Sequence, residues 1–277
     1  MGATGVRSVV RSAVRPTTRP AARQSAAAPA PGGHPLAQYL GAGSVLIDGS
    51  STLARYYTDA AGTALCATSL TDPVGNVLDL SGSSTPISKS TSGAKPRYKV
   101  ASGFKILQLN RVSALLPGQE LVVGPIDIQT TSAFYAVLKW SETTPGLDGL
   151  GPIFGSANGS CAYEMYNGYD QFQHSDLGGI KNVHGVVIDG AAGVVKAKCS
   201  PTQIDVWSST TVGGSLNYDA AAGTPFSASA VDMRIGSTAT GHDMVELAFM
   251  CYANGGVSVD GDAAILAYIN TQFAGGW

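Results

Sequence analysis

The feature that most constrains this chain is the shortness of its apolar runs, which turn-forming residues interrupt throughout. Past residue 44, β-branched and aromatic runs alternate with Gly, Asn, Asp and Pro. Many short strands with turns between them are typical of an antiparallel sandwich or jelly roll. The runs that predict strands most clearly are Glu120–Val123, Phe134–Trp140, Val183–Ile188, Gln203–Trp207 and Met244–Tyr252. We therefore expect an all-β fold, a two-sheet antiparallel jelly-roll sandwich with an extended N-terminal arm and a short C-terminal helix.

Two of these runs also predict where their residues lie. Phe134–Trp140 (FYAVLKW) is rich in aromatic and branched residues, which is typical of a central strand. In the QIDVW run that starts at position 203, alternation places Ile204 and Val206 on one face. Asp205 and Trp207 are then expected on the opposite face.

One helix is expected, at the end of the chain. Either Asp260 or Asp262 can cap its N-terminus through a side-chain oxygen. The residues that continue it are Ala263, Ala264, Leu266, Ala267, Ile269 and Asn270.

Charge is distributed unevenly along the chain. The net charge is -2, but the only charged residues before Asp48 are five arginines, Arg7, Arg11, Arg15, Arg19 and Arg23. Without those five, 12 basic residues remain against 19 acidic ones, so the rest of the chain carries about -7. A cationic arm on an acidic body favours contact with a neighbouring body or with another acidic surface.

The composition of the arm, residues 1–33, favours a docking role. Pro16 and Pro20 exclude a continuous helix, so at most residues 6–15 are expected to be helical. Beyond Arg23 the Ala, Pro and Gly residues are typical of a linker. Such a segment has no core of its own, so a partner surface must order it.

Other roles for the arm fit its residues to different degrees. The arginines interrupt the apolar region of a secretory signal, and Val6 stands where a myristoylation motif has Ser or Thr. A mitochondrial transit peptide fits by composition and stays open as an alternative. No aromatic residue lies among the arginines to stack on bases, which argues against nucleic acid as a partner. No apolar run approaches the roughly 18 residues of a membrane helix, so no membrane partner is expected.

Three segments of the body resemble a known family. YTDAAGTALCATSLTDPVGNVLDLSGSS (Tyr57–Ser84) resembles the opening of concanavalin-A-like, laminin-G-like jelly-roll domains of bacteriophage virion proteins. In that family a DAAGT…DPVG…D.SG stretch precedes the first strands. KPRYKVASGFKILQLN (Lys95–Asn110) is similar to the continuation. The part from MRIGSTATGHDMVELAFMCYANG to the last helix resembles the closing strands, so the likeness covers about 57–277.

The resemblance implies a virion structural protein of a tail, fibre or head decoration, located in the virion after assembly in the host cytoplasm. The arm would anchor it to capsid or tail, and the sandwich would serve assembly or host attachment. Its expected partners are other virion structural proteins and copies of itself, with host surface glycans as a further candidate. The domains are then a docking arm and linker at 1–33, a connecting segment at 34–56, and a lectin-like jelly roll at 57–277.

No pattern of residues predicts catalysis. The four glutamates are Glu120, Glu142, Glu164 and Glu246, and none lies in the ExDxxE pattern of the glucanases that share this sandwich. A hydrolase, the alternative from the same fold, would have to use Glu164 with Asp170, since retaining glycosidases need two carboxyl groups about 5–5.5 Å apart. No GxSxG elbow is present for a serine nucleophile. We expect a protein that is not an enzyme.

Metal ligation is not predicted either. The His/Asp pairs His174 with Asp176 and His242 with Asp243 lack the spacing of a metal site. Calcium is a ligand of many lectin-like domains, but Asp170 with Asp176 and Asp260 with Asp262 do not resemble an EF-hand loop. We therefore expect no cofactor and identify no calcium site. The widely spaced cysteines Cys66, Cys161, Cys199 and Cys251 leave both two disulfides and buried free thiols open.

One stretch combines aromatic rings with polar groups, as sugar-binding sites do. Its residues are Tyr163, Tyr166, Asn167, Tyr169, Asp170, Phe172, Gln173 and His174. They are candidates for glycan contacts or for an interface with another subunit, where aromatic residues are enriched. The alternative is that the rings fill the core of a hairpin.

Overall fold

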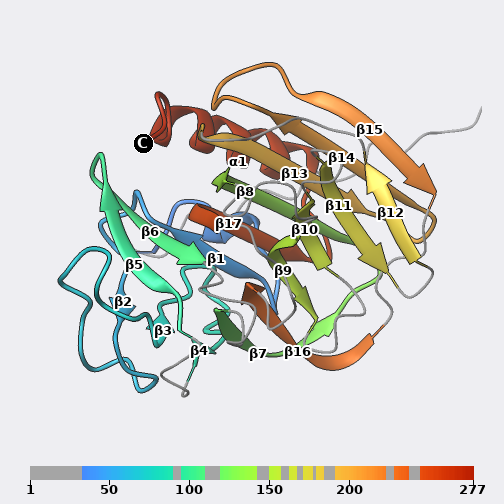
Figure 1. Cartoon of the computed structure of the whole chain (residues 1–277). Coiled ribbons are helices and arrows are strands. Elements are labelled where there is room, and N and C mark those ends of the chain that lie inside the picture. The colour runs from blue at the N-terminus through green and yellow to red at the C-terminus, as the bar shows by residue number, and fades with distance from the viewer. Residues whose placement is uncertain are drawn as a thin grey trace, which may run out of the picture.

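Two antiparallel β-sheets packed face to face make up the body of the molecule, with one α-helix on the outside of one sheet (Figure 1). The computed structural model describes residues 33–89, 95–109, 119–141, 150–156, 162–166, 171–176, 179–183, 191–222, 228–236 and 244–277. The expected all-β, two-sheet fold with a short C-terminal helix is confirmed. No helix in the described part of the chain is long and apolar enough to span a membrane.

The first sheet has eight strands in the order β15-β14-β13-β8-β17-β6-β5, with β1 also paired to β17. Their bounds are β1 Val45–Asp48, β5 Arg97–Ala101, β6 Phe104–Leu109, β8 Ser132–Ser141, β13 Gly193–Cys199, β14 Gln203–Ser209, β15 Asn217–Ala222 and β17 Met244–Asn254. The run predicted as a central strand lies in β8, between β13 and β17, as expected from its aromatic and branched residues.

The second sheet has nine strands in the order β12-β11-β10-β9-β16-β7-β4-β3-β2. Their bounds are β2 Tyr56–Tyr57, β3 Asn76–Val77, β4 Ile87–Ser88, β7 Glu120–Ile128, β9 Leu150–Ser156, β10 Ala162–Tyr166, β11 Gln171–Asp176, β12 Gly179–Val183 and β16 Ala228–Gly236. The predicted run Glu120–Val123 opens β7. Of the predicted run Val183–Ile188, residue 183 closes β12 and the rest lies outside the described residues.

The main core lies between the two sheets. Alternation sends every second side chain of each strand inward, and aromatic rings from both sheets meet there. Phe134 of β8 stacks on Tyr163 of β10 with ring centroids 4.4 Å apart, and Phe154 of β9 packs against Tyr252 of β17 at 4.9 Å. Ile204 and Val206 also face this core, which confirms the alternation predicted for the QIDVW run.

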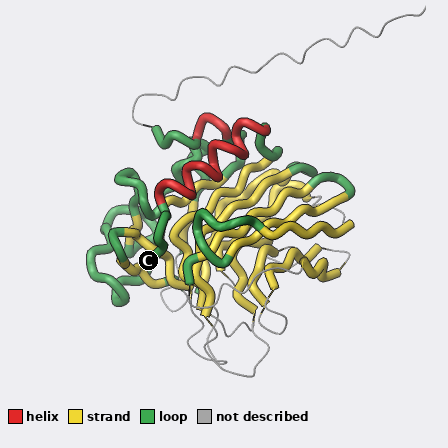
Figure 2. The backbone as a smooth tube through the Cα atoms, turned by 90° about the horizontal axis from the view of Figure 1, so that it is seen from above, coloured by secondary structure: helices red, strands yellow, loops and turns green. Residues whose placement is uncertain are grey.

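The helix α1 (Val259–Gln272) covers part of the outer face of the eight-stranded sheet (Figure 2). Its buried residues Ile265 and Ile269, with Phe273 after its end, pack on outward-facing side chains of the sheet. Those side chains include Leu46, Ile106, Tyr135, Val137 and Phe249. The helix therefore closes a second, smaller core on the outside of the sandwich.

The N-terminal cap of α1 differs from the prediction. Ser258 has extended backbone angles, and its hydroxyl accepts a hydrogen bond of 3.1 Å from the backbone N–H of Gly261. Asp260 and Asp262 lie in the first turn of the helix instead of at the cap. The expected aspartate cap is therefore wrong, because the seryl oxygen one turn earlier already satisfies a free helix N–H.

Residues 34–56, expected as a connecting segment, contribute directly to the sandwich. They contain the 3-10 turn η1 (Ala37–Tyr39) and strand β1, whose four residues are all buried. The register of β1 against β17 pairs Val45 with Tyr252 and Asp48 with Phe249. Residues 45–48 are therefore part of the eight-stranded sheet.

Candidate functional site

The structure places only some of the residues that the sequence singled out. The five arginines of the arm lie outside the described residues, as do Asn167, Tyr169 and Asp170 of the aromatic stretch. Tyr166 ends β10 and Phe172 lies in β11, and these two strands pair with each other. The prediction that this stretch contacts a glycan or a subunit therefore stays a prediction for most of its residues.

Tyr163 belongs to the core. Its side chain is fully buried, its ring stacks on Phe134, and its hydroxyl lies 3.2 Å from the sulfur of Cys199. Burial raises the pKa of Tyr163 well above its ordinary value. The ring of Tyr163 therefore fills the core, which was one of the alternatives from the sequence. Alternation along β10 turns it toward the other sheet.

The cysteines in the described part of the chain are free thiols. Cys199 and Cys251 are buried and Cys66 is half-buried, while Cys161 lies outside the described residues. Burial raises the pKa of Cys66 to about 12, with the charge of Asp72 adding to the effect. For these three cysteines the alternative of thiols packed in the core, without a disulfide, is therefore confirmed.

Two of the four glutamates are held in ion pairs. Glu120 is buried and accepts from Lys89 and, at 2.7 Å, from Arg234. Glu246 accepts from Lys99, from Gln108 at 3.2 Å and from the indole N–H of Trp277 at 3.1 Å. Burial raises the pKa of Glu246, but these donors outweigh burial and hold the pKa below its ordinary value. The group therefore stays ionised. Both carboxylates join strands in the fold and are poor candidates for a general acid.

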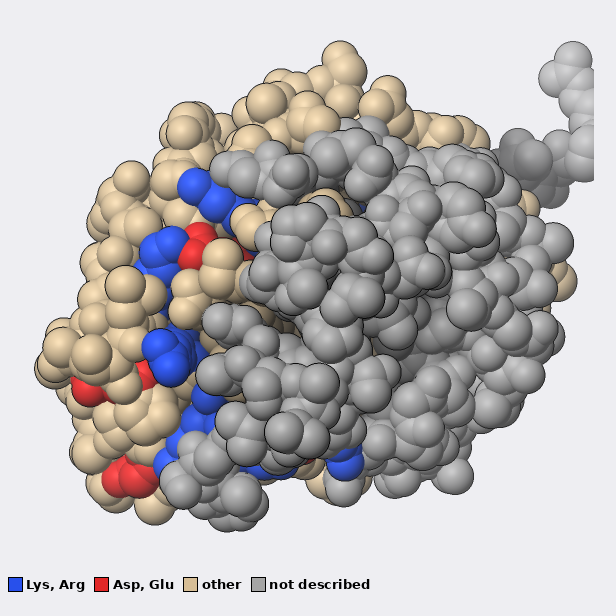
Figure 3. Space-filling model, viewed as in Figure 1, with Lys and Arg blue, Asp and Glu red and all other residues tan. Residues whose placement is uncertain are grey.

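A band of Lys and Arg side chains lies over the part of the molecule occupied by β2–β6 (Figure 3). Two lysines of β6 and of the segment before β5 donate to backbone carbonyls of nearby loops. Lys95 donates to Thr58 at 2.9 Å, and Lys105 donates to Ala54 at 2.9 Å. Burial lowers the pKa of Lys105, and the charge of Arg55 lowers it further. These two lysines therefore stabilise loops of the sandwich.

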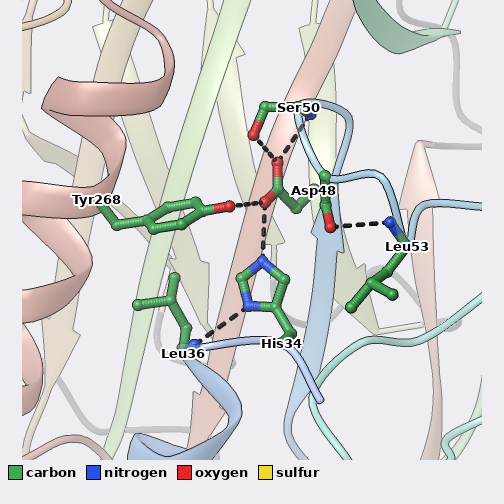
Figure 4. A network of polar contacts seen from close by, with 7 residues as sticks. His34, Leu36, Asp48, Ser50, Leu53 and Tyr268 are labelled. Atoms are coloured by element: carbon green, nitrogen blue, oxygen red, sulfur yellow. Dashed lines mark hydrogen bonds and ion pairs between the residues drawn. The ribbon is translucent and has the colours of Figure 1, made fainter. Parts of the chain in front are cut away.

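A buried polar cluster, which we call the His34 clamp, lies at the foot of the arm (Figure 4). The Nε2 atom of His34 lies 2.8 Å from Oδ2 of Asp48, and the hydroxyl of Tyr268 donates to the same oxygen at 2.5 Å. Ser50 donates to the other oxygen, Oδ1, from its backbone N–H and its hydroxyl, at 2.9 and 2.6 Å. The side chains of His34 and Asp48 are both fully buried.

The hydrogen bonds of the clamp define the protonation of its members. The backbone N–H of Leu36 donates to Nδ1 of His34 at 3.2 Å, so Nε2 carries the ring proton and donates it to Asp48. Burial raises the pKa of Asp48, but the bonds from His34, Ser50 and Tyr268 lower it to below its ordinary 3.8. The clamp is therefore a carboxylate surrounded by donors.

The clamp contains Ser, His and Asp, but its geometry is not that of a catalytic triad. The hydroxyl of Ser50 donates to Asp48, whereas a nucleophile would have to lie against the imidazole. The side chains of His34, Ser50 and Tyr268 instead converge on the carboxylate of Asp48, which joins the end of β1 to α1 and to the residue before η1. Sequence reasoning missed this cluster, because His34 and Asp48 are 14 residues apart and form no recognisable motif. The clamp ties residue 34, near the start of the described part of the chain, to β1 and α1.

Asp262 joins α1 to strands β8 and β13 of the sheet. It accepts from Lys196 at 2.9 Å, from Lys198 at 3.0 Å and from the hydroxyl of Tyr135 at 2.7 Å. Burial raises the pKa of Asp262, but the lysine and tyrosine donors lower it below its ordinary value. Two ammonium groups already satisfy this carboxylate. No group of three or more His, Cys, Asp or Glu side chains suited to a metal ion occurs among the described residues.

Solved structures similar to this chain are β-sandwiches of the same architecture. A GH54 α-L-arabinofuranosidase is 13% identical with a TM-score of 0.50, and the match covers 84% of this chain and 60% of the enzyme. The fold of this chain is a two-sheet antiparallel β-sandwich. Lectin II from Ulex europaeus is 15% identical (TM-score 0.38; 56% of this chain, 89% of the lectin). The exoplasmic/lumenal domain of VIP36 is 9% identical (TM-score 0.40; 54% and 78%).

These likenesses concern the fold and carry no activity to this chain. The chain spans about 60% of the length of the arabinofuranosidase. No family model matches the sequence, and no curated protein matches it.

Proposed function

We propose that this protein is a non-enzymatic structural and binding protein, held in a larger assembly by residues 1–33. The observation that carries the proposal is the His34 clamp. It ties the first residue after the arm to β1 and α1 through a buried carboxylate. An anchoring arm needs a rigid attachment to its domain, because a loosely attached segment would not hold the domain in place.

The chemistry of the arm supports a protein partner with an acidic surface. Five arginines without any acid precede a body that carries about -7, so copies of this chain and acidic neighbours both attract the arm. Arginine also pairs with carboxylates in a planar, two-bonded geometry, which suits a specific dock.

The assembly that fits best is a bacteriophage particle. The resemblance of Tyr57–Ser84 to virion jelly-roll domains supports this choice, with the protein located in the virion after assembly in the host cytoplasm. Its partners are then other virion structural proteins and further copies of the chain. The sandwich serves assembly or host attachment.

Deleting residues 1–33 tests the anchor. The truncated chain keeps the His34 clamp, so it is expected to fold with an unchanged circular dichroism spectrum but to be lost from sedimenting particles. As a matched control, replacing all five arginines of the arm with lysine retains the charge and should preserve part of the incorporation. Normal incorporation of the truncated chain would refute the anchor.

A second candidate function is a glycan-binding module. A specific observation favours it, namely an exposed aromatic residue, Tyr218, on a surface rich in hydrogen-bonding groups. Binding of sugar by the sandwich and anchoring by the arm are compatible in one chain.

A further inference from the structure

The part of the outer sheet face beyond α1 carries polar and aromatic side chains instead of a second core. On β13, β14 and β15, residues of one face are aligned by the register of the strands. Lys196 of β13 pairs with Trp207 of β14, which pairs in turn with Tyr218 of β15. In the neighbouring row Lys198 pairs with Asp205. Because Ile204 and Val206 point into the core, Asp205 and Trp207 point outward, as the sequence predicted.

Trp207 of this face contacts both a lysine and a second aromatic ring. The ammonium group of Lys196 lies 4.2 Å from the centroid of the Trp207 ring, a cation–π contact. On the other side the ring of Tyr218 lies 5.2 Å away, tilted by 38°. Tyr218 itself is 57% exposed. The pair therefore presents a fixed aromatic surface to solvent.

Hydrogen-bonding groups surround that ring. Oδ1 of Asp205 accepts from the hydroxyl of Tyr218 at 2.8 Å and from the side-chain amide of Gln203 at 2.5 Å. Lys198, about one-third exposed, stands across from Asp205 and pairs with Asp262 at 3.0 Å. The two lysines and two aspartates of this region balance in charge, so the surface attracts neither anions nor cations strongly.

We propose that these residues, the Tyr218 platform (Gln203, Asp205, Trp207 and Tyr218, bordered by Lys198), bind a neutral pyranose. This rests on the glycan-binding function proposed above and assigns its site. A pyranose has an apolar face of C–H groups that packs on an aromatic ring, and a rim of hydroxyls that needs carboxylate, amide and ammonium partners. The platform supplies the aromatic ring and the polar partners in two adjacent rows of paired residues. This arrangement is fixed before any ligand binds.

The balance of charge selects the class of sugar. An acidic sugar would bring a carboxylate next to Asp205 and Asp262, with the lysine charges already engaged. A neutral hexopyranoside replaces the water around Tyr218 without leaving a charge unpaired. We therefore expect gluco-, galacto- or mannopyranosides to bind, and sialic or uronic acids to bind more weakly.

The experiment uses the full chain on an array of neutral and acidic glycans, followed by calorimetric titration of the best neutral oligosaccharide. Tyr218→Ala removes the stacking ring and is expected to weaken binding about tenfold or more. Tyr218→Phe keeps the ring and loses one hydroxyl, so a smaller loss of a few-fold is expected. Tyr57→Ala, a half-buried tyrosine on the other sheet, is the matched control and should bind normally.

Each outcome decides the proposal. Neutral-glycan binding that falls with Tyr218→Ala but not with Tyr57→Ala supports the platform. Glycan binding that Tyr218→Ala leaves intact overturns the platform while the glycan-binding function survives. Absence of binding to every glycan overturns both, and the anchoring function is then judged by the arm deletion alone. Self-association in sedimentation that Tyr218→Ala abolishes, without glycan binding, would make this face a contact between copies and refute the sugar site.

Discussion

The outer face of the eight-stranded sheet has two halves that differ in what covers them. Over β1, β6, β8 and β17 the helix α1 packs on the sheet, and the outward side chains there are mostly apolar. Over β13, β14 and β15 the outward residues include lysines, an aspartate and the exposed Tyr218. Strand alternation assigns a side chain to a face, but the covering layer decides whether that face must be apolar.

The covered half also contains one informative exception. Asp48 is fully buried beneath α1, where a carboxylate without partners would be costly. His34 before η1, Ser50 just after β1 and Tyr268 of α1 all donate to it. A buried charge in this position joins three elements that apolar contact alone would leave free to slide.

The largest effect is expected from removing an aromatic ring under the helix. Phe273 is fully buried, stacks on Phe104 at 5.1 Å and meets Phe249 at 5.8 Å. Phe273→Ala should lower the free energy of unfolding by about 3–5 kcal/mol, because it leaves a cavity in the second core. Chemical denaturation measures the change. Val259→Ala, at an 84% exposed position of α1, should change it by less than about 0.5 kcal/mol. A small effect of Phe273→Ala would mean that α1 does not close a core.

The next effect is expected at the clamp. Asp48→Asn places an amide among three donors, so the free energy of unfolding should fall by about 2–3 kcal/mol at neutral pH. Asp127→Asn, at an exposed carboxylate of β7, is the control and should have little effect.

The clamp also predicts a pH dependence. Since the pKa of Asp48 is lower in the folded chain than its ordinary 3.8, its contribution is fully present above about pH 4. It is lost as the pH falls through the folded pKa. The melting temperatures of wild type and Asp48→Asn should therefore converge between about pH 4 and strong acid, on the order of pH 2. A difference that stays constant over this range would contradict an ionised Asp48.

A smaller effect is expected at the boundary between the halves. Asp262→Asn removes the partner of Lys196, whose side chain is nearly buried, and should cost about 1–2 kcal/mol. Asp260→Asn, in the same helical turn but exposed, controls for the helix dipole and should cost only a few tenths of a kcal/mol. Equal losses in thermal unfolding of the two variants would show that the pairing with β13 contributes nothing.

The smallest effect on stability is expected on the uncovered half. Tyr218→Ala removes an exposed ring and should shift the free energy of unfolding by no more than about 0.5 kcal/mol. A differential scanning measurement beside the binding assay tests this. A large loss of stability would place Tyr218 among the residues that hold the sheet together, contrary to the comparison of the two halves.

The sequence predicted the fold better than the sites. Aromatic and branched content identified β8, and strict alternation identified the two faces of β14, because both signals are local. The strand β1 (VLID) was missed since four residues give no measurable period. Trp207 was correctly placed outside the core, but Tyr218 became its neighbour only through the register of β14 and β15. Contacts such as His34 with Asp48 depend on tertiary packing, which a single sequence does not encode in any spacing.

The position of the clamp has a mechanical consequence. A force applied through residues 1–33 enters the domain at His34, and two short hydrogen bonds on Asp48 divide it between a strand and a helix. The four-residue β1 is paired along its length with β17, which is itself paired with β8 and β6. If a partner holds residues 1–33, as we propose, tension passes through the pairing of β1 with β17 to the middle of the eight-stranded sheet, and through Tyr268 to α1.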